Sequence, residues 1–311
     1  MKIQFCLILK AHCLKTQVTL GYNVSNDLFV DCTYIGINRS PRSDTLPKFY
    51  GIEILDFNLG VNIKTTIPNL FKITPRLSEL EVSTNKVLIE YDGNFLLNFL
   101  LTLKFFKKDI YIDCHNCAVE NEDGKFLRYC INLVYLYCSK VIFRAKIIVH
   151  NQSIMDSYPI NSVVVNTPYP DLGQYISKKK NNDVLFSCSL NSDEPIEFII
   201  RTCRKLEKQG YKAQITGDFK KLREEIQIMG APFFTGYISK VSYFELLAHS
   251  KVMVCLTNRE KTLLYSPREG ISLGLKVIVN PSQVNRDFFG EKVIYVDPED
   301  DLAEVVINAI E

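Results

Sequence analysis

The sequence of 311 residues contains no tryptophan and only four histidines. Neither charge is in excess, because 37 Lys and Arg face 35 Asp and Glu, and this balance argues against a dedicated nucleic-acid-binding domain. No apolar run approaches the roughly 18 residues of a membrane-spanning helix. The motifs G-x-G-x-x-G and G-x-x-x-x-G-K-[ST] are both missing, which weakens assignment as a nicotinamide-dependent dehydrogenase or a P-loop NTPase.

Ten cysteines are the unusual feature of the composition. Several lie in apolar runs, as Cys6 and Cys255 do, where a free thiol behaves as a small buried hydrophobe. The one close pair, Cys114 and Cys117, offers two ligands where a structural zinc ion needs four. A chain of this length also needs no disulfide to bury a sufficient core. We therefore expect free buried thiols and no metal site.

The N-terminus has a short apolar run at residues 3–9, after Lys2 and before Lys10. No small-residue cleavage site of the A-x-A type follows it, so a first β-strand fits this run better than a secretion signal does. We therefore expect a cytoplasmic protein, either free or peripheral at a membrane.

The second half of the chain alternates between short apolar runs and amphipathic stretches of about ten residues. This alternation predicts a parallel sheet with helices on both faces. The predicted strands are residues 183–188, 211–216, 233–236, 252–256, 276–279 and 293–296, and the predicted helices are residues 196–207, 220–229, 242–250, 267–273 and 300–310.

The first half shows the same alternation less regularly, and residues 10–60 predict no element. The predicted strands are residues 3–9, 86–90, 109–113, 141–143, 146–150 and 163–165, and the predicted helices are residues 95–106 and 125–138. Turn formers and charges at residues 167–182 mark a boundary. The sequence thus predicts an α/β protein of two doubly wound domains, 1–166 and 167–311. Their ligands are expected at the carboxyl ends of the strands, in a cleft between the domains.

The richest local pattern lies between residues 258 and 279, where a polar loop separates two apolar strands. Pro267 suits the first position of a helix, and Gly274 suits its end. Glu269, in the first helical turn, could accept hydrogen bonds from a ribose diol. Alternatively, its charge does no more than complement the helix dipole.

This stretch resembles the C-terminal signature of retaining glycosyltransferases of the GT-B fold, chiefly family four. That signature has two glutamates separated by seven residues. Glu269 matches the second, whereas Lys261 stands at the first and Glu260 lies one position early. The resemblance implies that Glu269 holds the nucleotide ribose and that the preceding loop binds the diphosphate. The loop residues are Thr262, Leu263, Leu264, Tyr265 and Ser266, and the candidate cations are Lys220, Lys221, Arg259, Lys261 and Arg268.

Further matches occur in the same order along residues 85–300. The "DEP" turn at residues 187–195 and the strand end before Gly217, where the base would pack, resemble family-four enzymes. They also resemble the chitobiosyldiphosphodolichol mannosyltransferases, as does Tyr111-Ile112-Asp113-Cys114-His115-Asn116 in the first domain. The likeness points to an archaeal or archaeal-virus type of enzyme.

Three residues of that first-domain motif are candidates for chemistry. Asp113 and His115 are predicted catalytic residues that bind the acceptor hydroxyl or a donor-sugar hydroxyl. His115 could accept a proton or donate a hydrogen bond to a phosphate, since an imidazole titrates near neutral pH. Asn116 is predicted to contact the donor. The alternative is a turn whose polar side chains satisfy one another.

The resemblance implies a metal-independent transferase, with no cofactor, that moves a hexose from a UDP- or GDP-linked donor to an acceptor hydroxyl. The acceptor would be a glycan or a lipid-linked sugar. Retention follows from a family-four likeness and inversion from the mannosyltransferase likeness. A sugar-nucleotide epimerase or hydrolase and an inactive nucleotide-sugar-binding subunit are the alternatives. Residues 95–108, apolar and ending in Lys107-Lys108, form either a buried crossover helix or a peripheral membrane contact.

Overall fold

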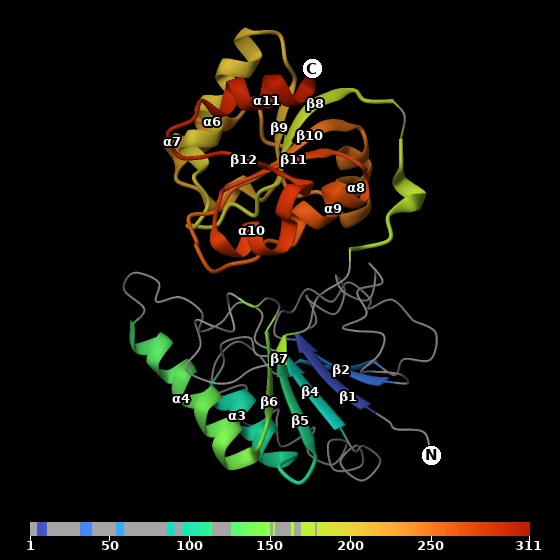
Figure 1. Ribbon diagram of the computed structural model, residues 1–311, viewed down its shortest axis with the longest axis vertical. Coiled ribbons are helices and arrows are strands. Elements are labelled where there is room, and N and C mark those ends of the chain that lie inside the picture. The colour runs from blue at the N-terminus through green and yellow to red at the C-terminus, as the bar shows by residue number, and fades with distance from the viewer. Residues whose placement is uncertain are drawn as a thin grey trace. The chain divides into compact units, whose positions relative to one another are not determined.

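A computed structural model of the protein is drawn in Figure 1. It describes residues 5–10, 32–38, 54–58, 86–90, 95–113, 126–149, 152, 163–164, 169–177 and 179–311. The chain divides into two compact units, Met1–Pro168 and Tyr169–Glu311, whereas the sequence placed its boundary at 166/167. No described helix is long and apolar enough to cross a membrane.

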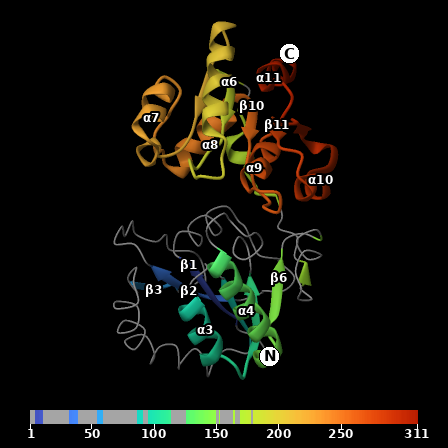
Figure 2. The same ribbon diagram turned by 90° about the vertical axis from the view of Figure 1, so that its left-hand side faces the viewer.

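The first unit is built on a parallel sheet of seven strands in the order β3-β2-β1-β4-β5-β6-β7. The order reverses between β1 and β4, as in a doubly wound sheet. Helices α3 and α4 lie side by side, as the two views in Figures 1 and 2 agree. The elements are β1 (Phe5–Lys10), β2 (Cys32–Asn38), β3 (Ile54–Asn58), β4 (Lys86–Glu90), α3 (Phe95–Lys104), β5 (Asp109–Asp113), α4 (Phe126–Phe143), β6 (Lys146–Val149) and β7 (Val163–Val164).

One prediction for this unit is wrong. Residues 141–143 form the last turn of α4 and not a strand. Their Val-Ile-Phe sequence is β-prone, but neither glycine nor proline separates it from the preceding helix. The ring of Phe143 packs against Phe99 of α3 at a centroid distance of 5.9 Å, which holds the extra turn in place. Strands β2 and β3 fall in the stretch for which the sequence predicted nothing.

The second unit is a five-stranded parallel sheet in the order β12-β11-β10-β8-β9. A parallel bridge between Ile215 and Phe234 extends the sheet beyond β9, so the predicted strand at 233–236 is reduced to one bridge. The strands are β8 (Asn182–Phe186), β9 (Ala213–Ile215), β10 (Ser250–Cys255), β11 (Lys276–Val279) and β12 (Ile294–Tyr295). The helices are α6 (Ile196–Lys208), α7 (Glu224–Gly230), α8 (Lys240–Ala248), α9 (Ser266–Ser272), α10 (Gln283–Phe289) and α11 (Leu302–Ile310), with 3-10 turns η1 (Gly173–Tyr175), η2 (Phe219–Lys221) and η3 (Gly290–Lys292).

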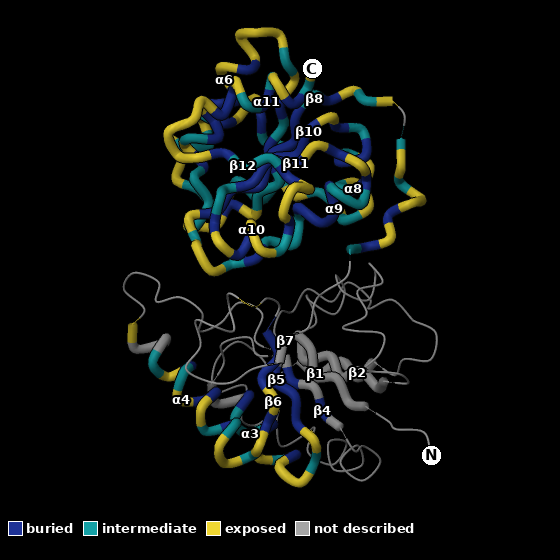
Figure 3. Tube along the Cα trace, in the orientation of Figure 1, coloured by how far each residue is buried: buried dark blue, intermediate teal, exposed yellow. Residues whose placement is uncertain are grey.

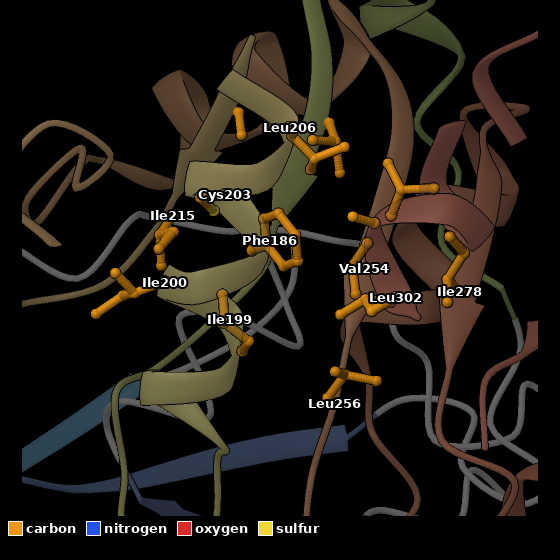
Figure 4. Packing of buried hydrophobic residues seen from close by; sticks show 14 of the residues in the cluster. Phe186, Ile199, Ile200, Cys203, Leu206, Ile215, Val254, Leu256, Ile278 and Leu302 are labelled. Carbon is orange, nitrogen blue, oxygen red and sulfur yellow. The ribbon is translucent and has the colours of Figure 1, made fainter. Parts of the chain in front are cut away.

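Strand alternation sorts the core of this unit onto two faces of the sheet. Phe186 and Val254 are fully or nearly fully buried and belong to one cluster with α6 and α11, as Figure 4 shows with Ile199 and Leu302. Met253, on the other face, meets α9, where a Cβ on Gly270 would lie 2.5 Å from the Met253 Sδ. Figure 3 shows the buried strands between more exposed helices. Helices on both faces explain why these strands read as continuous apolar runs.

Two helices of this unit differ from the prediction. The single helix expected at residues 220–229 is a 3-10 turn followed by α7, because Asp218 caps the turn and Leu222 adopts an extended backbone. Helix α10 was not predicted, and its start is marked by the Ser282 side chain, which accepts a hydrogen bond from Asn285 N–H. The expected end of α9 is confirmed, since Gly274 has φ +70° and the Gly274 and Leu275 N–H groups donate to Ile271 and Gly270 C=O.

Candidate functional site

The order of the second sheet reverses between β8 and β10, and ligands of such sheets bind beside the carboxyl ends of the strands at that point. The segments that follow these ends are the turn 187–195 after β8, Thr216-Gly217 after β9 and the loop 256–265 after β10. The predicted donor residues of the second unit lie in these segments or in α9, except the candidate cations Lys220 and Lys221, which lie in η2. The topology thus collects them at one edge of the sheet.

Glu269 is a buried carboxylate in the first turn of α9, with its side chain 5% exposed. Its Oε1 accepts a hydrogen bond from Lys240 Nζ, the first residue of α8, at 2.7 Å. The Lys240 ammonium also lies 4.6 Å from the ring centroid of Phe244 and 5.0 Å from that of Tyr243. The ion pair offsets part of the cost of burying the carboxylate, and the two aromatic faces add cation–π attraction.

A hydroxyl pair lies beside this ion pair. Ser187, directly after β8, and Tyr243, on α8, are joined by a 3.0 Å hydrogen bond between their hydroxyl oxygens. Burial, and then the negative charge of Glu269, raises the pKa of Tyr243 well above its ordinary value. The phenol is therefore a neutral hydrogen-bonding group at any ordinary pH.

The thiols at this edge are protonated. Burial raises the pKa of Cys255, at the end of β10, to about 12, although a hydrogen bond with Ser266 acts against the shift. Burial also raises the pKa of Cys188 well above its ordinary value. Because the thiolate is the nucleophilic form, neither residue is suited to covalent catalysis at neutral pH.

The turn after β8 is closed by one of its own carboxylates. Glu194 accepts hydrogen bonds from Ser189 N–H at 2.9 Å, from Leu190 N–H at 2.6 Å and from the Ser189 hydroxyl at 2.9 Å. Successive N–H groups of this kind form a concave site for an anion. Since Glu194 fills it, these amides are not available to a diphosphate. Burial raises the pKa of Glu194, while the hydrogen bonds from Ser189 and Leu190 lower it.

The neighbouring Asp193 ties this turn to the loop after β10. Its Oδ2 accepts a hydrogen bond from the Thr257 hydroxyl at 2.9 Å and lies 3.5 Å from Arg259 Nε, and its C=O accepts one from Asn258 N–H at 2.7 Å. The two chain segments at the switch point are therefore held as one unit, with the Arg259 guanidinium between them. Arg259 was among the cations that the sequence proposed for a diphosphate.

Gly217 follows β9 with φ +118°. A Cβ there would lie 2.7 Å from Leu190 Cγ and 3.0 Å from the Cys188 carbonyl oxygen. The Thr216 hydroxyl accepts a hydrogen bond from Cys188 N–H at 3.0 Å. Glycine is thus required for the close approach of this strand end to the β8 turn, and its predicted role beside a nucleotide base stays a prediction.

The predicted diphosphate loop is partly buried. Leu263 is buried and Thr262, Leu264, Tyr265 and Ser266 are half-buried. Arg268 is fully buried, with its Cζ 4.0 Å from the ring centroid of Tyr265 and 5.6 Å from that of Phe288. This stacking fixes the loop against α9. Diphosphate binding by these residues, and by Lys220, Lys221 and Lys261, stays a prediction.

Asp113 is the last residue of β5, paired in register with Glu90 of β4 and Ile148 of β6. It therefore lies at the carboxyl edge of the first sheet, beside two neighbouring strand ends. His115 and Asn116, together with Cys114 and Cys117, lie outside the described residues. Their predicted roles stay predictions.

A further sequence pattern needs its structural context. Gly270-Ile271-Ser272-Leu273-Gly274 has the G-x-S-x-G spacing of a hydrolase nucleophile elbow. That elbow needs its serine at a sharp turn from a strand into a helix. Ser272 instead ends α9, ahead of β11. The context excludes a nucleophile elbow at this serine.

Lys240, Ser187 and Tyr243 were not among the predicted site residues. Lys240 carried no sequence signal, because the predicted helix began at residue 242 and the structure begins α8 two residues earlier. Ser187 opens the turn at residues 187–195 that the resemblance covers, but neither its hydroxyl nor that of Tyr243 was assigned a role. In the part of the chain that the structure describes, no group of three or more His, Cys, Asp or Glu residues could hold a metal ion.

No protein-family model matches the sequence, and no curated protein matches it. The structure is similar to that of Anabaena HepE in complex with UDP and glucose, at a TM-score of 0.71 and 12% identity over 100% of this chain and 90% of that one. It is also similar to sucrose-phosphate synthase from Thermosynechococcus elongatus, at a TM-score of 0.66 and 12% identity over 99% of this chain and 89% of that one. The UDP-GlcNAc 2-epimerase from Methanocaldococcus jannaschii is similar at a TM-score of 0.53 and 12% identity over 100% of this chain and 92% of that one. The predicted fold class is confirmed: the chain has the GT-B fold, with two Rossmann-like α/β units.

Proposed function

We propose that this chain is a glycosyltransferase that moves a hexose from a nucleoside diphosphate sugar to an acceptor hydroxyl. The observation that carries the proposal is Glu269, a buried carboxylate at the switch point of the second sheet whose Oε1 is bound by Lys240. A carboxylate in this position suits the two neighbouring hydroxyls of a ribose, each of which donates one hydrogen bond. The GT-B fold supports this proposal, since proteins of that fold include HepE with bound UDP.

The leaving diphosphate requires positive charge where its own charge develops. Lys240 supplies a cation whose side chain is 36% exposed beside the buried Glu269. When the ribose hydroxyls donate hydrogen bonds to the Glu269 carboxylate, the Lys240 ammonium can direct one of its N–H groups toward a phosphate oxygen. We propose this role for Lys240, with Arg259 as the second cation at the same edge. The loop 262–266 would line the diphosphate.

The acceptor would be activated by the first unit. Asp113, at the end of β5, and His115 would orient the acceptor hydroxyl and take up its proton, while Asn116 would contact the donor. Transfer needs no metal in this proposal, because protein cations neutralise the leaving group. The stereochemical course depends on the side from which the acceptor hydroxyl attacks the anomeric carbon. Attack from the side that the diphosphate leaves retains the configuration, as in the family-four likeness, and attack from the opposite side inverts it, as in the mannosyltransferase likeness.

The test is a turnover assay with the purified full chain in EDTA. UDP-linked and GDP-linked hexoses are offered with lipid-linked and free glycan acceptors, and nucleoside diphosphate release is measured together with the anomeric configuration of the product by NMR. We expect acceptor-dependent release from one donor class, most readily the UDP-linked one, that persists in EDTA. Binding of a donor without release or transfer would instead indicate an inactive binding subunit, to which Lys261 at the first glutamate position would be suited.

A sugar-nucleotide epimerase is the second candidate, because the same fold occurs in the Methanocaldococcus jannaschii UDP-GlcNAc 2-epimerase. The two activities differ in their need for an acceptor. NMR of UDP-GlcNAc incubated with the chain alone distinguishes them. Inversion at C2 without an acceptor would support the epimerase and contradict the transferase.

A further inference from the structure

Helix α4 of the first unit has an apolar outer face. Its inner side is fixed on α3, where the Thr102 and Tyr135 hydroxyl oxygens lie 2.9 Å apart and Phe99 packs on Phe143. Tyr135 and Leu136 are fully buried on that side. Among the residues of α4 whose side chains the structure describes, those that point outward are 38% to 65% exposed and all are apolar or aromatic: Phe126, Ile131, Val134, Tyr137, Val141 and Ile142, named here the α4 outer face.

These six residues share one side of the helix. At about 100° per residue they fall within an arc of about 160°, and the half-buried Cys130 and Cys138 fall inside the same arc. A surface helix normally carries polar residues on its solvent side. A continuous apolar arc at this level of exposure marks an interaction surface.

The surroundings of this face are rich in basic residues. Residues 95–108 and 126–149 contain no Asp or Glu and seven basic residues: Lys104, Lys107, Lys108, Arg128, Lys140, Arg144 and Lys146. Lys146 opens β6 in register with Tyr111 of β5, and its Nζ donates to the Tyr111 hydroxyl at 3.1 Å. The residues that precede these two strands therefore lie at one edge of the sheet. Lys107 and Arg144 are exposed there, near the acidic Asp109 that begins β5.

We propose that the α4 outer face docks on an anionic lipid bilayer, with its apolar side chains in the interfacial layer and Lys107, Lys108, Lys140 and Arg144 on the lipid headgroups. An apolar helix face combined with basic residues is the chemistry of an interfacial helix, and α4 lies on the bilayer without crossing it. A second copy of this chain is a poorer partner for the face. A two-fold contact through α4 would bring no acidic residue of the helix toward Lys140, because α4 contains no Asp or Glu.

The test is flotation of the full chain with vesicles of phosphatidylcholine alone or with about one third phosphatidylglycerol. The wild-type chain should float with the anionic vesicles at low salt and be released in part by high salt. Val134→Glu combined with Val141→Glu should lower binding at least tenfold. Lys107→Gln combined with Arg144→Gln should weaken it by roughly fivefold for each charge removed.

The matched control is Ile228→Glu combined with Ile176→Glu, which changes two exposed apolar residues of the second unit, 70% and 63% exposed. It should bind vesicles as the wild type does, and circular dichroism should show all variants folded. Equal binding to neutral and anionic vesicles, or no binding, overturns the proposal. So does a wild-type dimer in light scattering that Val134→Glu with Val141→Glu converts to a monomer, because the face would then bind a second copy.

Discussion

Lys240 and Glu269 form an ion pair of 2.7 Å although each lies in the first turn of its own helix, α8 and α9. The carboxylate is favoured by the dipole of α9, whereas the ammonium is disfavoured by that of α8. The pair therefore gains its stability from mutual attraction in a buried setting and from the rings of Tyr243 and Phe244. It also fixes α8 and α9 relative to each other at the proposed donor site.

Loss of one partner should be costly. Lys240→Met leaves a buried carboxylate without its ammonium, and we expect the free energy of unfolding to fall by about 2 kcal/mol, between the values typical of exposed and fully buried pairs. Urea unfolding followed by far-ultraviolet circular dichroism measures this change. For the double variant Lys240→Met with Glu269→Gln, we expect the free energy of unfolding to fall by less than the sum of the two single-variant losses. The difference should be at least about 1 kcal/mol. Strict additivity would show that the two side chains do not interact.

Gly217 should tolerate no side chain. Gly217→Ala meets both an unfavourable backbone conformation and contacts of 2.7 to 3.0 Å with the β8 turn, so we expect a loss of about 2 to 3 kcal/mol. Gly210→Ala is the matched control, because Gly210 also has a positive φ, +85°, but no atom near its Cβ position. It should lose about 1 kcal/mol of unfolding free energy. Equal losses in the two variants would remove the steric argument.

Asp183 should make stability depend on acid pH. Burial raises the pKa of this carboxyl, but the Lys212 N–H bond and the Lys251 ammonium at 2.7 Å outweigh it, so the folded pKa lies below 3.8. The folded state then binds fewer protons than the unfolded state does. The contribution is present above about pH 4 and is lost as the pH falls through the folded pKa.

Asp183→Asn should therefore lower the free energy of unfolding by about 1 kcal/mol at neutral pH and by progressively less below pH 4. The exposed Glu299→Gln should change it by less than about 0.5 kcal/mol. A difference between wild type and Asp183→Asn that grows as the pH falls would contradict the assigned sign.

The thiols of the second unit should resist alkylation. With burial raising the pKa of Cys255 to about 12, and those of Cys188 and Cys203 well above the ordinary value, few thiolates are present near pH 8. Peptide-resolved mass spectrometry after iodoacetamide should find Cys130 and Cys138 of α4, both half-buried, modified before Cys188, Cys203 and Cys255. Rapid native-state modification of Cys255 would show that the end of β10 is open to reagent.

Local pattern was sufficient for much of the second unit. Apolar runs defined β8, β10 and β11 closely, and the Gly274 signal marked the end of α9, because these features depend on neighbours in the sequence. The same logic misread residues 141–143, whose β-branched side chains suit a strand but continue α4. Strand β3 pairs with β2 although a long connection separates the two in sequence, and a local pattern of apolar and polar residues does not predict such a pairing.

The candidate site divides in the same way. Glu269 could be found from spacing, because the signature lies within one short stretch of sequence. The partner of its carboxylate could not, since Lys240 is 29 residues away and meets it only through the packing of two helices. The turn at residues 187–195 was also found from its sequence, but its local hydrogen bonds could not be. The Glu194 carboxylate accepts hydrogen bonds from the N–H groups of its own turn.

The central claim is that the second unit binds the nucleotide of a sugar donor through Glu269. Isothermal titration of UDP into the full chain, with GDP in parallel, tests it most directly when wild type is compared with Glu269→Gln and with Glu225→Gln, an exposed carboxylate on α7. We predict that wild type and Glu225→Gln bind the same nucleotide equally and that Glu269→Gln, still folded, binds it at least tenfold more weakly. Unchanged affinity in Glu269→Gln, or no binding of either nucleotide by the wild type, would contradict the account.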